Sequence, residues 1–518
     1  MSTFHGLEMA KRALAAQQAA LYTTGHNISN AHTDGYSRQR VNFNADIAFP
    51  PGSRNSPKIA GQLGTGVDVG AIQRIRDQFL DTQFRTENSR DGYWSSQRAT
   101  LSRLEDLLNE PSDSGLSKTM KQFWQSLEDL SVNPENSGAR SVVKERAVAV
   151  ADTFNYLSDT LKSIQADLGD EIKITAERVN VLLKDINDLN KQIKRLEPHG
   201  YLPNDLYDER DRLVDELSEM VNIKVHTSDS GGDALTIAEG VYSIELLDAN
   251  GNSLGDNDEK VFLIDASVDD LDVAENEFGI IFDEDDGYGF TVADSDDSSI
   301  AYLYEFKHFK QTGTLIGLVD SYYQYEGQSE TTMSIPEISE KLDKLAKEFV
   351  EAFNEQHRAG YDFDGNEGID FFDPSGVTAG SISVAEAILK DPNKIAAAGK
   401  RGDDGEALVG DGDNALELSR VFDQSIDDLD NQSVTNFYES LIGDIGVSAE
   451  ESIRRQENTA TLLSQVENQR LSVSAVSLDE EMTNLIKFQH AYNAAARSMT
   501  SMDEMLDRII NNMGLVGR

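Results

Sequence analysis

Both ends of this 518-residue chain carry apolar residues at a seven-residue spacing. Two such sets offset by three residues form the a and d positions of a coiled coil. The C-terminal set is Leu485, Phe488, Tyr492, Met499, Met502, Leu506, Ile509 and Met513. The N-terminal set is Leu7, Leu14, Leu21 and Ile28. Each end therefore needs a helical partner, and we predict that these residues form an assembly interface, with the two ends also able to pair with each other.

Helical periodicity covers most of the rest of the chain. A second heptad seam is formed by Ile172, Val179, Ile186 and Ile193 with Leu182, Leu189 and Leu196. Proline and glycine residues end the periodic stretches, since neither continues a helix well. The predicted helical stretches are 2–30, 71–109, 116–196 with a break near Asn133-Pro134, 204–220, 312–358 and 416–513. Residues 31–70 are predicted to be irregular or extended.

The composition changes at about residue 226, where acidic residues come to outnumber basic ones strongly. Short β-rich runs alternate there with turn residues, which predicts a small inserted β domain. The predicted strands are Val241–Leu247, Val261–Ile264, Phe278–Phe282, Gly289–Val292 and Ile300–Phe306. A second, loop-rich insertion covers 361–415.

We therefore predict a mainly α fold: a helical coiled-coil rod formed by both termini, with β and loop-rich insertions projecting from its middle. Four units follow from this pattern. They are 1–45 with 478–518 as an inner coiled-coil domain, 46–225 with 312–360 and 416–477 as a helical bundle, 226–311 as the acidic β insertion, and 361–415 as the second insertion.

The formal net charge of −46 argues against nucleic acid as a partner, because phosphates require Lys and Arg. It also argues against anionic membrane surfaces, and no run approaches the roughly 18 apolar residues of a membrane span. The absence of cysteine excludes disulfides and thiol chemistry. Residues 1–30 lack the compact apolar stretch of a cleavable signal peptide, so we expect any export to proceed without cleavage of a leader.

The best metal candidate runs from Asp362 to Asp373, with oxygen ligands at several positions of an EF-hand loop. Glu367 stands where that loop requires glycine, so an Asp/Gly-rich hairpin is the favoured alternative. The acidic groups at 283–286 and 294–297 are interpreted as a solvated face. No zinc-type histidine spacing and no Walker-type phosphate loop occurs in the sequence. We predict no catalytic, cofactor or metal site, and hence no enzyme.

The stretch from Ala20 to Gln39 contains Asn27, Asn30, Gly35, Tyr36 and Arg38. It resembles the N-terminal signature of flagellar axial proteins. Further stretches are similar to the flagellar hook-associated protein 1 family, the first hook–filament junction protein: 204–211, 382–384, 391–396 and 485–496. The family turn usually has proline before the glycine, whereas here the residue is Asp34, which also supports a tight turn.

The resemblance implies a structural role at the junction between hook and filament, outside the cell, after export by the flagellar type III apparatus. It implies as partners the hook protein, the second junction protein, an export chaperone and further copies in a ring at the hook tip. Two alternatives stay open: a hook or rod subunit, and a secreted enzyme or adhesin whose activity resides in an insertion. Since isolated helices are marginal in water, we expect the two ends to become rigid only on docking.

Overall fold

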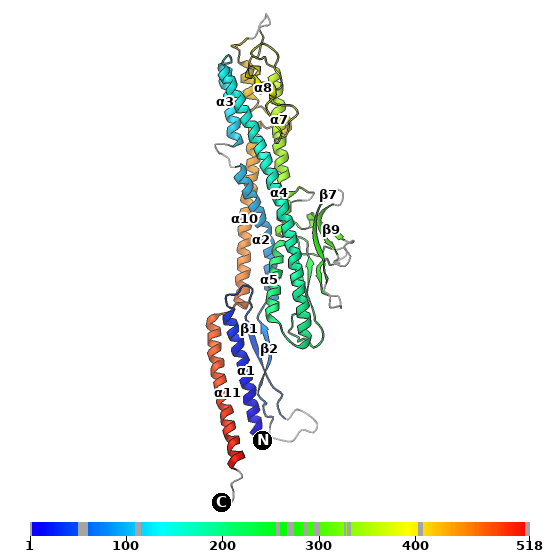
Figure 1. Ribbon diagram of the computed structural model, residues 1–518, viewed down its shortest axis with the longest axis vertical. Helices are drawn as coiled ribbons and strands as arrows, with labels where there is room; N and C mark the ends of the chain where they lie inside the picture. The colour runs from blue at the N-terminus through cyan, green and yellow to red at the C-terminus, as the bar shows by residue number, and fades with distance from the viewer. Residues whose placement is uncertain are drawn as a thin grey trace.

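The computed structural model describes residues 3–49, 61–108, 115–254, 260–266, 274–283, 287–293, 301–325, 328, 333–401 and 408–512. Met513, the acidic residues 284–286 and those at 294–297 lie outside this range. The described chain is an elongated, mainly helical molecule (Figure 1). The predicted fold class is confirmed.

Long helices form the central rod. They are α2 (Gln78–Leu108), α3 (Leu116–Val132), α4 (Ser137–Leu196), α5 (Asn204–Met220), α7 (Ile335–Arg358) and α10 (Val434–Ser474). At 1.5 Å per residue, the 60 residues of α4 extend for roughly 90 Å. The predicted break before α4 is confirmed: Asn136 caps the helix by accepting from the backbone N–H of Gly138 at 2.8 Å.

The apolar core runs along this rod and is rich in aromatic side chains. The ring of Phe123 on α3 lies 5.3–6.3 Å from four other rings, those of Phe353, Phe371, Phe372 and Phe422. The first and last residues of this buried cluster are Tyr93 and Ala449. Among the described residues, the core therefore stops before it reaches either end of the chain.

Two small antiparallel sheets project from the side of α4 (Figure 1). One has the order β3-β4-β5-β6, with β3 (Ile223–Ser228), β4 (Val241–Leu246), β5 (Phe262–Asp265) and β6 (Ala274–Glu275). The other has the order β7-β8-β9, with β7 (Glu277–Asp283), β8 (Gly287–Ala293) and β9 (Ala301–Glu305). The five predicted strands are confirmed, whereas β3 and β6 were missed.

Asparagine side chains of α4 attach both sheets to the rod. Asn180 accepts from the backbone N–H of Phe278 at 2.9 Å and donates to the carbonyl of the same residue at 2.8 Å. Asn190 does the same with Tyr242 on β4, at 3.1 and 2.9 Å. Each carboxamide thus replaces a neighbouring strand, which satisfies backbone groups that a buried edge would otherwise leave unpaired.

The two ends of the chain lie side by side at one pole as α1 (Thr3–Ser29) and α11 (Leu478–Asn512), which we call the terminal pair (Figure 1). An antiparallel hairpin of β1 (Gln39–Ala45) and β2 (Val67–Arg74) packs beside α1. The prediction of helix from residue 71 was wrong at its start: Ile72 pairs with Val41 in the hairpin, and helix begins only at Gln78. The pairing of β1 with β2 thus prevails over the helical spacing of apolar residues at 71–77.

Two other predicted stretches are confirmed as predominantly helical, and each is divided into separate helices. The stretch 312–358 divides into α6 (Thr314–Tyr322) and α7, because Ser334 caps a new helix that has proline in its first turn. The stretch 416–513 divides into α9 (Asp413–Arg420), α10 and α11. A turn at Asp430 and Asn431, both with positive φ, precedes α10.

The loop-rich insertion lies at the pole opposite the terminal pair and contains α8 (Glu386–Lys390). The carboxylate of Asp362 accepts from the backbone N–H groups of Asp364 and Asn366 at 2.9 and 2.8 Å, and a β-bridge joins Tyr361 to Glu367. These contacts form a tight Asp/Gly-rich hairpin, which was the favoured alternative to an EF-hand loop. Among the described residues, no group of three or more His, Asp or Glu side chains gathers in a way that could hold a metal ion.

Candidate assembly interface

The structure brings the two predicted seams together within one chain. Met502 of α11 reaches Gly6 of α1, where an added Cβ would lie 3.1 Å from the Met502 methyl carbon. The ring of Phe488 lies 6.1 Å from that of Phe43 on the hairpin, in an edge-on arrangement. The small residues Ala16 and Ala20 are buried on α1, which lets the helices approach closely.

The seams are only partly enclosed by this pairing. Leu506 is buried and Ile509 is 38% exposed. The remaining described members are all half-buried: Leu7, Leu14, Leu21, Ile28, Leu485, Phe488, Tyr492, Met499 and Met502. Pairing within the chain therefore leaves apolar area on the seams that a neighbouring molecule can still cover.

Other apolar side chains of the terminal pair point to solvent, and the heptad analysis missed them. The most exposed are Phe4, Tyr22, Met482, Ile486, Met505 and Ile510, which we call the outer apolar set. Ile486 is 52% exposed although its neighbour Leu485 is half-buried. The four-residue spacing of Met482 and Ile486 was the available signal, since it marks a second helix face.

The motif residue Asn27 lies at the end of α1 and is 1% exposed. Its carbonyl oxygen accepts from the Gln39 backbone N–H at 3.0 Å and from the Tyr36 hydroxyl at 2.8 Å. Its amide donates to the Gln39 carbonyl at 2.8 Å and to the Glu481 carboxylate at 3.1 Å. The whole hydrogen-bonding capacity of the side chain is used, which explains why asparagine is needed at this position.

The motif continues through a tight turn to Arg38. Gly35 has φ +78°, a left-handed conformation that favours glycine, and the turn delivers Tyr36 to Asn27. Arg38 Nε donates to the Glu481 carboxylate at 2.8 Å, and its Nη1 lies 2.7 Å from that of Glu480. At the end of α1, the backbone N–H and the side-chain amide of Asn30 both donate to the His26 carbonyl, at 3.0 and 3.1 Å.

Burial raises the pKa of Tyr36, and the carboxylates of Asp205, Asp208 and Glu481 raise it further. The hydroxyl therefore keeps its proton and donates to Asn27. The motif residues together fasten the end of α1 to the start of α11.

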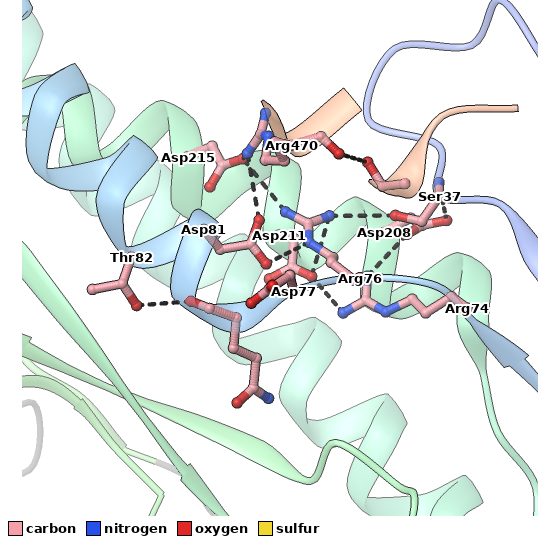
Figure 2. Close-up of polar contacts among 12 residues, drawn as sticks. Ser37, Arg74, Arg76, Asp77, Asp81, Thr82, Asp208, Asp211, Asp215 and Arg470 are labelled. Carbon is pink, nitrogen blue, oxygen red and sulfur yellow. Dashed lines mark hydrogen bonds and ion pairs between the residues drawn. The ribbon is translucent and has the colours of Figure 1, made fainter. Parts of the chain in front are cut away.

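The stretch 204–211, which carried part of the resemblance, meets this turn in space. The Ser37 backbone N–H donates to Asp208 at 3.0 Å, and the Gln39 amide donates to Asp205 at 2.9 Å. Behind these contacts lies a group of buried charges that sequence reasoning missed. We call it the joint cluster: Arg74, Arg76, Arg85, Arg470, Asp81, Asp208, Asp211 and Asp215. Figure 2 labels all of these residues except Arg85.

Family models match three parts of the chain. Residues 101–372 match the helical domain of the flagellar hook-associated protein FlgK. Residues 7–36 match a flagella basal body rod protein model, and 467–513 match the C-terminal model of the flagellar basal body rod FlgEFG proteins. No helix in the described part of the chain has the length and apolar content needed to cross a membrane.

Relatives match along nearly the full length. Flagellar hook-associated protein 1 of Bacillus subtilis is 44% identical, with 100% of each chain covered. The protein of the same name from Escherichia coli is 25% identical over 97% of this chain and 98% of its own length. The structure of the flagellar hook junction protein FlgK from Burkholderia pseudomallei shares the fold, with a TM-score of 0.60, 13% identity, and coverage of 76% of this chain and 100% of that one. The chain therefore belongs to the flagellar hook-associated protein 1 family.

Proposed function

We propose that this chain is a structural component of the bacterial flagellum that joins the hook to the filament. The observation that carries the proposal is the terminal pair: both ends of the chain pack together at one pole and carry the exposed outer apolar set. Covering these exposed apolar side chains would favour association with another protein. Family membership supports the same role, since the relatives named above are hook-associated proteins.

Assembly is driven by covering the terminal pair with neighbouring subunits. Burying a large apolar side chain yields about 1.5–3 kcal/mol, so half-covering the six side chains of the outer apolar set contributes several kcal/mol to docking. The seam residues predicted from the sequence contribute the area that α1 and α11 leave open. Docking therefore covers apolar area that the isolated chain leaves exposed. We also propose that the chain is divided into the four units predicted from the sequence: the inner coiled-coil domain, the helical bundle, the acidic β insertion and the second insertion.

The partners that we propose are the hook protein, the second junction protein, an export chaperone and further copies in a ring. The chaperone would bind the α11 segment as an amphipathic helix in a groove. The chain acts outside the cell after export without leader cleavage, and it performs no catalysis.

A gene deletion and its complementation test this function. We expect electron microscopy of the deletion strain to show hooks that lack filaments and medium that contains unassembled filament protein. The full chain should restore filaments, whereas a chain lacking 1–35 and 480–518 should be folded but inactive. Normal filaments in the deletion strain would refute the proposal.

The rod-protein models that match both ends favour one second candidate, a hook or rod subunit. The same deletion distinguishes it, because loss of a rod or hook subunit removes the hook itself. The match of 101–372 to the hook-associated helical domain weighs against this candidate.

A further inference from the structure

Three chain segments meet at one level where the terminal pair adjoins the rod. The backbone N–H of Arg38, after α1, donates to the carbonyl of Ser474 at the end of α10, at 2.8 Å. The carbonyl of Arg38 accepts from the N–H of Ile75, after β2, at 2.8 Å. The two covalent connections to the rod, from β2 to α2 and from α10 to α11, therefore meet at one joint.

The apolar core borders this joint, where the hydroxyl of the core residue Tyr242 donates to Asp211 at 3.1 Å. Within the described residues, its buried members begin at Tyr93 and end at Ala449, so none belongs to α1, β1, β2, α11 or the last part of α10. Charged side chains are buried here instead: Arg74, Asp81, Arg85, Asp208 and Asp211 are each less than a tenth exposed. Apolar contact is non-directional, whereas paired guanidinium and carboxylate groups fix orientation as well as distance.

Three carboxylates of α5 form one side of the cluster, at positions that share a helix face. Asp208 accepts from Arg74 Nη1 at 2.9 Å, and Asp211 accepts from Arg85 Nη2 at 3.0 Å. Asp215 accepts from Arg85 Nε at 2.8 Å. Helix α5 is thereby fixed to both β2 and α2.

Two arginines connect these carboxylates to the connecting segments (Figure 2). Arg76, just after β2, lies 2.8 Å from Asp81 and 3.5 and 3.6 Å from Asp211 and Asp215. Arg470, one turn before the end of α10, forms an ion pair with Asp215 and lies 3.7 Å from Asp81.

The guanidinium of Arg470 also stacks on the Phe84 ring, 3.9 Å from its centre. Its planar group is therefore held in orientation from two directions.

The charges of the cluster are mutually dependent. Burial raises the pKa of Asp211, but Arg76, Arg74 and Arg85 more than offset this effect and hold it well below its usual value. Asp211 is therefore ionised and remains bound by several arginines at once. Removing one arginine leaves buried carboxylates that must find another cation or water, which requires the joint to open.

The geometry points to Arg76 and Arg470 as positioning residues that set the angle between the terminal pair and the rod. Through Asp215 and Asp81 they hold the end of α10 and the end of β2 against α2 and α5. The angle determines where the outer apolar set is presented to a neighbouring subunit. In this sense the inference deepens the proposed function, although the angle itself is a property of the isolated chain.

Double electron–electron resonance, which measures the distance between two spin labels, tests this inference on the full-length protein. Because the chain has no cysteine, two introduced cysteines are the only labelling positions. The exposed residues Glu457 on α10 and Asn493 on α11 form a label pair across the joint, and Lys11 with Asn493 forms a pair inside the terminal pair. The variant is Arg470→Gln, and its matched control is Arg454→Gln, an exposed arginine on the same helix.

We expect Arg470→Gln to broaden the distance distribution across the joint by roughly twofold, because a loosened joint samples several angles. The distribution inside the terminal pair and all distributions in Arg454→Gln should stay unchanged. Arg470→Lys keeps the charge but lacks the planar guanidinium group, so its distance distribution should have an intermediate width. This variant also serves as the test if Arg470→Gln does not fold.

An unchanged distribution across the joint in both Arg470 variants, with or without a lower melting temperature, would overturn the inference. The measurement needs no hook or filament. Its failure is therefore distinct from failure of the junction function, which the deletion strain tests.

Discussion

The amide of Asn27 donates a hydrogen bond of 3.1 Å to the carboxylate of Glu481, a residue 454 positions further along the chain. Both side chains are almost completely buried. This contact joins the two ends of the protein directly. Asn27 and Arg38 of the N-terminal signature thus find partners on α11.

Substituting Asn27→Ala should destabilise the terminal pair by about 1–3 kcal/mol, because Glu481 and the Gln39 backbone lose buried partners. Hydrogen exchange should accelerate in the first turns of α11 while the rod stays protected. Asn493→Ala, at an exposed position of α11, is the matched control and should change stability by less than about 0.5 kcal/mol. Equal exchange in both variants would show that the motif does not fasten the two ends.

Adjacent residues of α11 should respond differently to the same new charge. Ile486→Asp changes an exposed side chain of the outer apolar set, so the isolated protein should melt at its usual temperature while filament attachment in cells is lost. Leu485→Asp changes a half-buried side chain in the seam, so it should loosen the pairing of α1 with α11 in the isolated protein. Normal motility with Ile486→Asp would remove this residue from the assembly surface.

The buried His357 should make stability depend on acid. Its Nε2 accepts from the Ala396 N–H at 2.8 Å, so the proton of the neutral ring is on Nδ1, which donates to the Ile369 carbonyl. Burial lowers the pKa of His357 from 6.5 to about 4. A lowered folded-state pKa contributes stability that is present above pH 6.5 and is lost as the pH falls toward 4, here roughly 3 kcal/mol. Denaturant unfolding of His357→Gln should show a shallower loss over this window.

The buried Asp320 should have the opposite effect on stability, which it increases as the pH falls. Burial raises its pKa to about 6, although the hydroxyls of Tyr325 and Tyr93 donate to it and oppose the rise. A raised folded-state pKa contributes stability that is complete below the unfolded value near 3.9 and is lost as the pH rises through 6. Asp320→Asn should therefore make the loss of stability on acidification steeper. A parallel pH profile in this variant would show that the carboxyl ionises without cost.

A close crossing of α2 and α6 should make Gly317 intolerant of a methyl group. An added Cβ would collide with the Ser96 hydroxyl and lie 2.7 Å from the Tyr93 carbonyl. Gly317→Ala should cost about 1–3 kcal/mol through overpacking. Gly443→Ala on α10 is the matched control, since nothing lies within 4 Å of its added Cβ and alanine favours helix. If both alanines were tolerated equally, the crossing would have room to adjust.

Periodicity predicted the long helices well because their apolar faces repeat over many turns. Ile172, Val179, Ile186 and Ile193 are all buried on α4 as the heptad spacing requires. Leu196, assigned to the same seam, is instead 38% exposed, because α4 ends at this residue and the chain turns away. Family resemblance, rather than periodicity, located Asn27 and Arg38.

The hairpin and the joint cluster could not be predicted in the same way, since their partners lie far apart in sequence. Phe43 is partly exposed and the β1–β2 hairpin has a bulge, so its alternation is weak. The spacing of Asp208, Asp211 and Asp215 does mark one charged face of α5. No local pattern reveals, however, that arginines from β2, α2 and α10 cover it.

The position of both chain ends at one pole has a practical consequence for labelling this protein. A fluorescent protein fused to either end would crowd the surface on which neighbouring subunits are proposed to dock. The turn at Gly251, with φ +81° and nothing within 4 Å of an added Cβ, lies between β4 and β5 of the β insertion. An epitope inserted there would report where the molecule sits in a living cell while leaving both ends unencumbered.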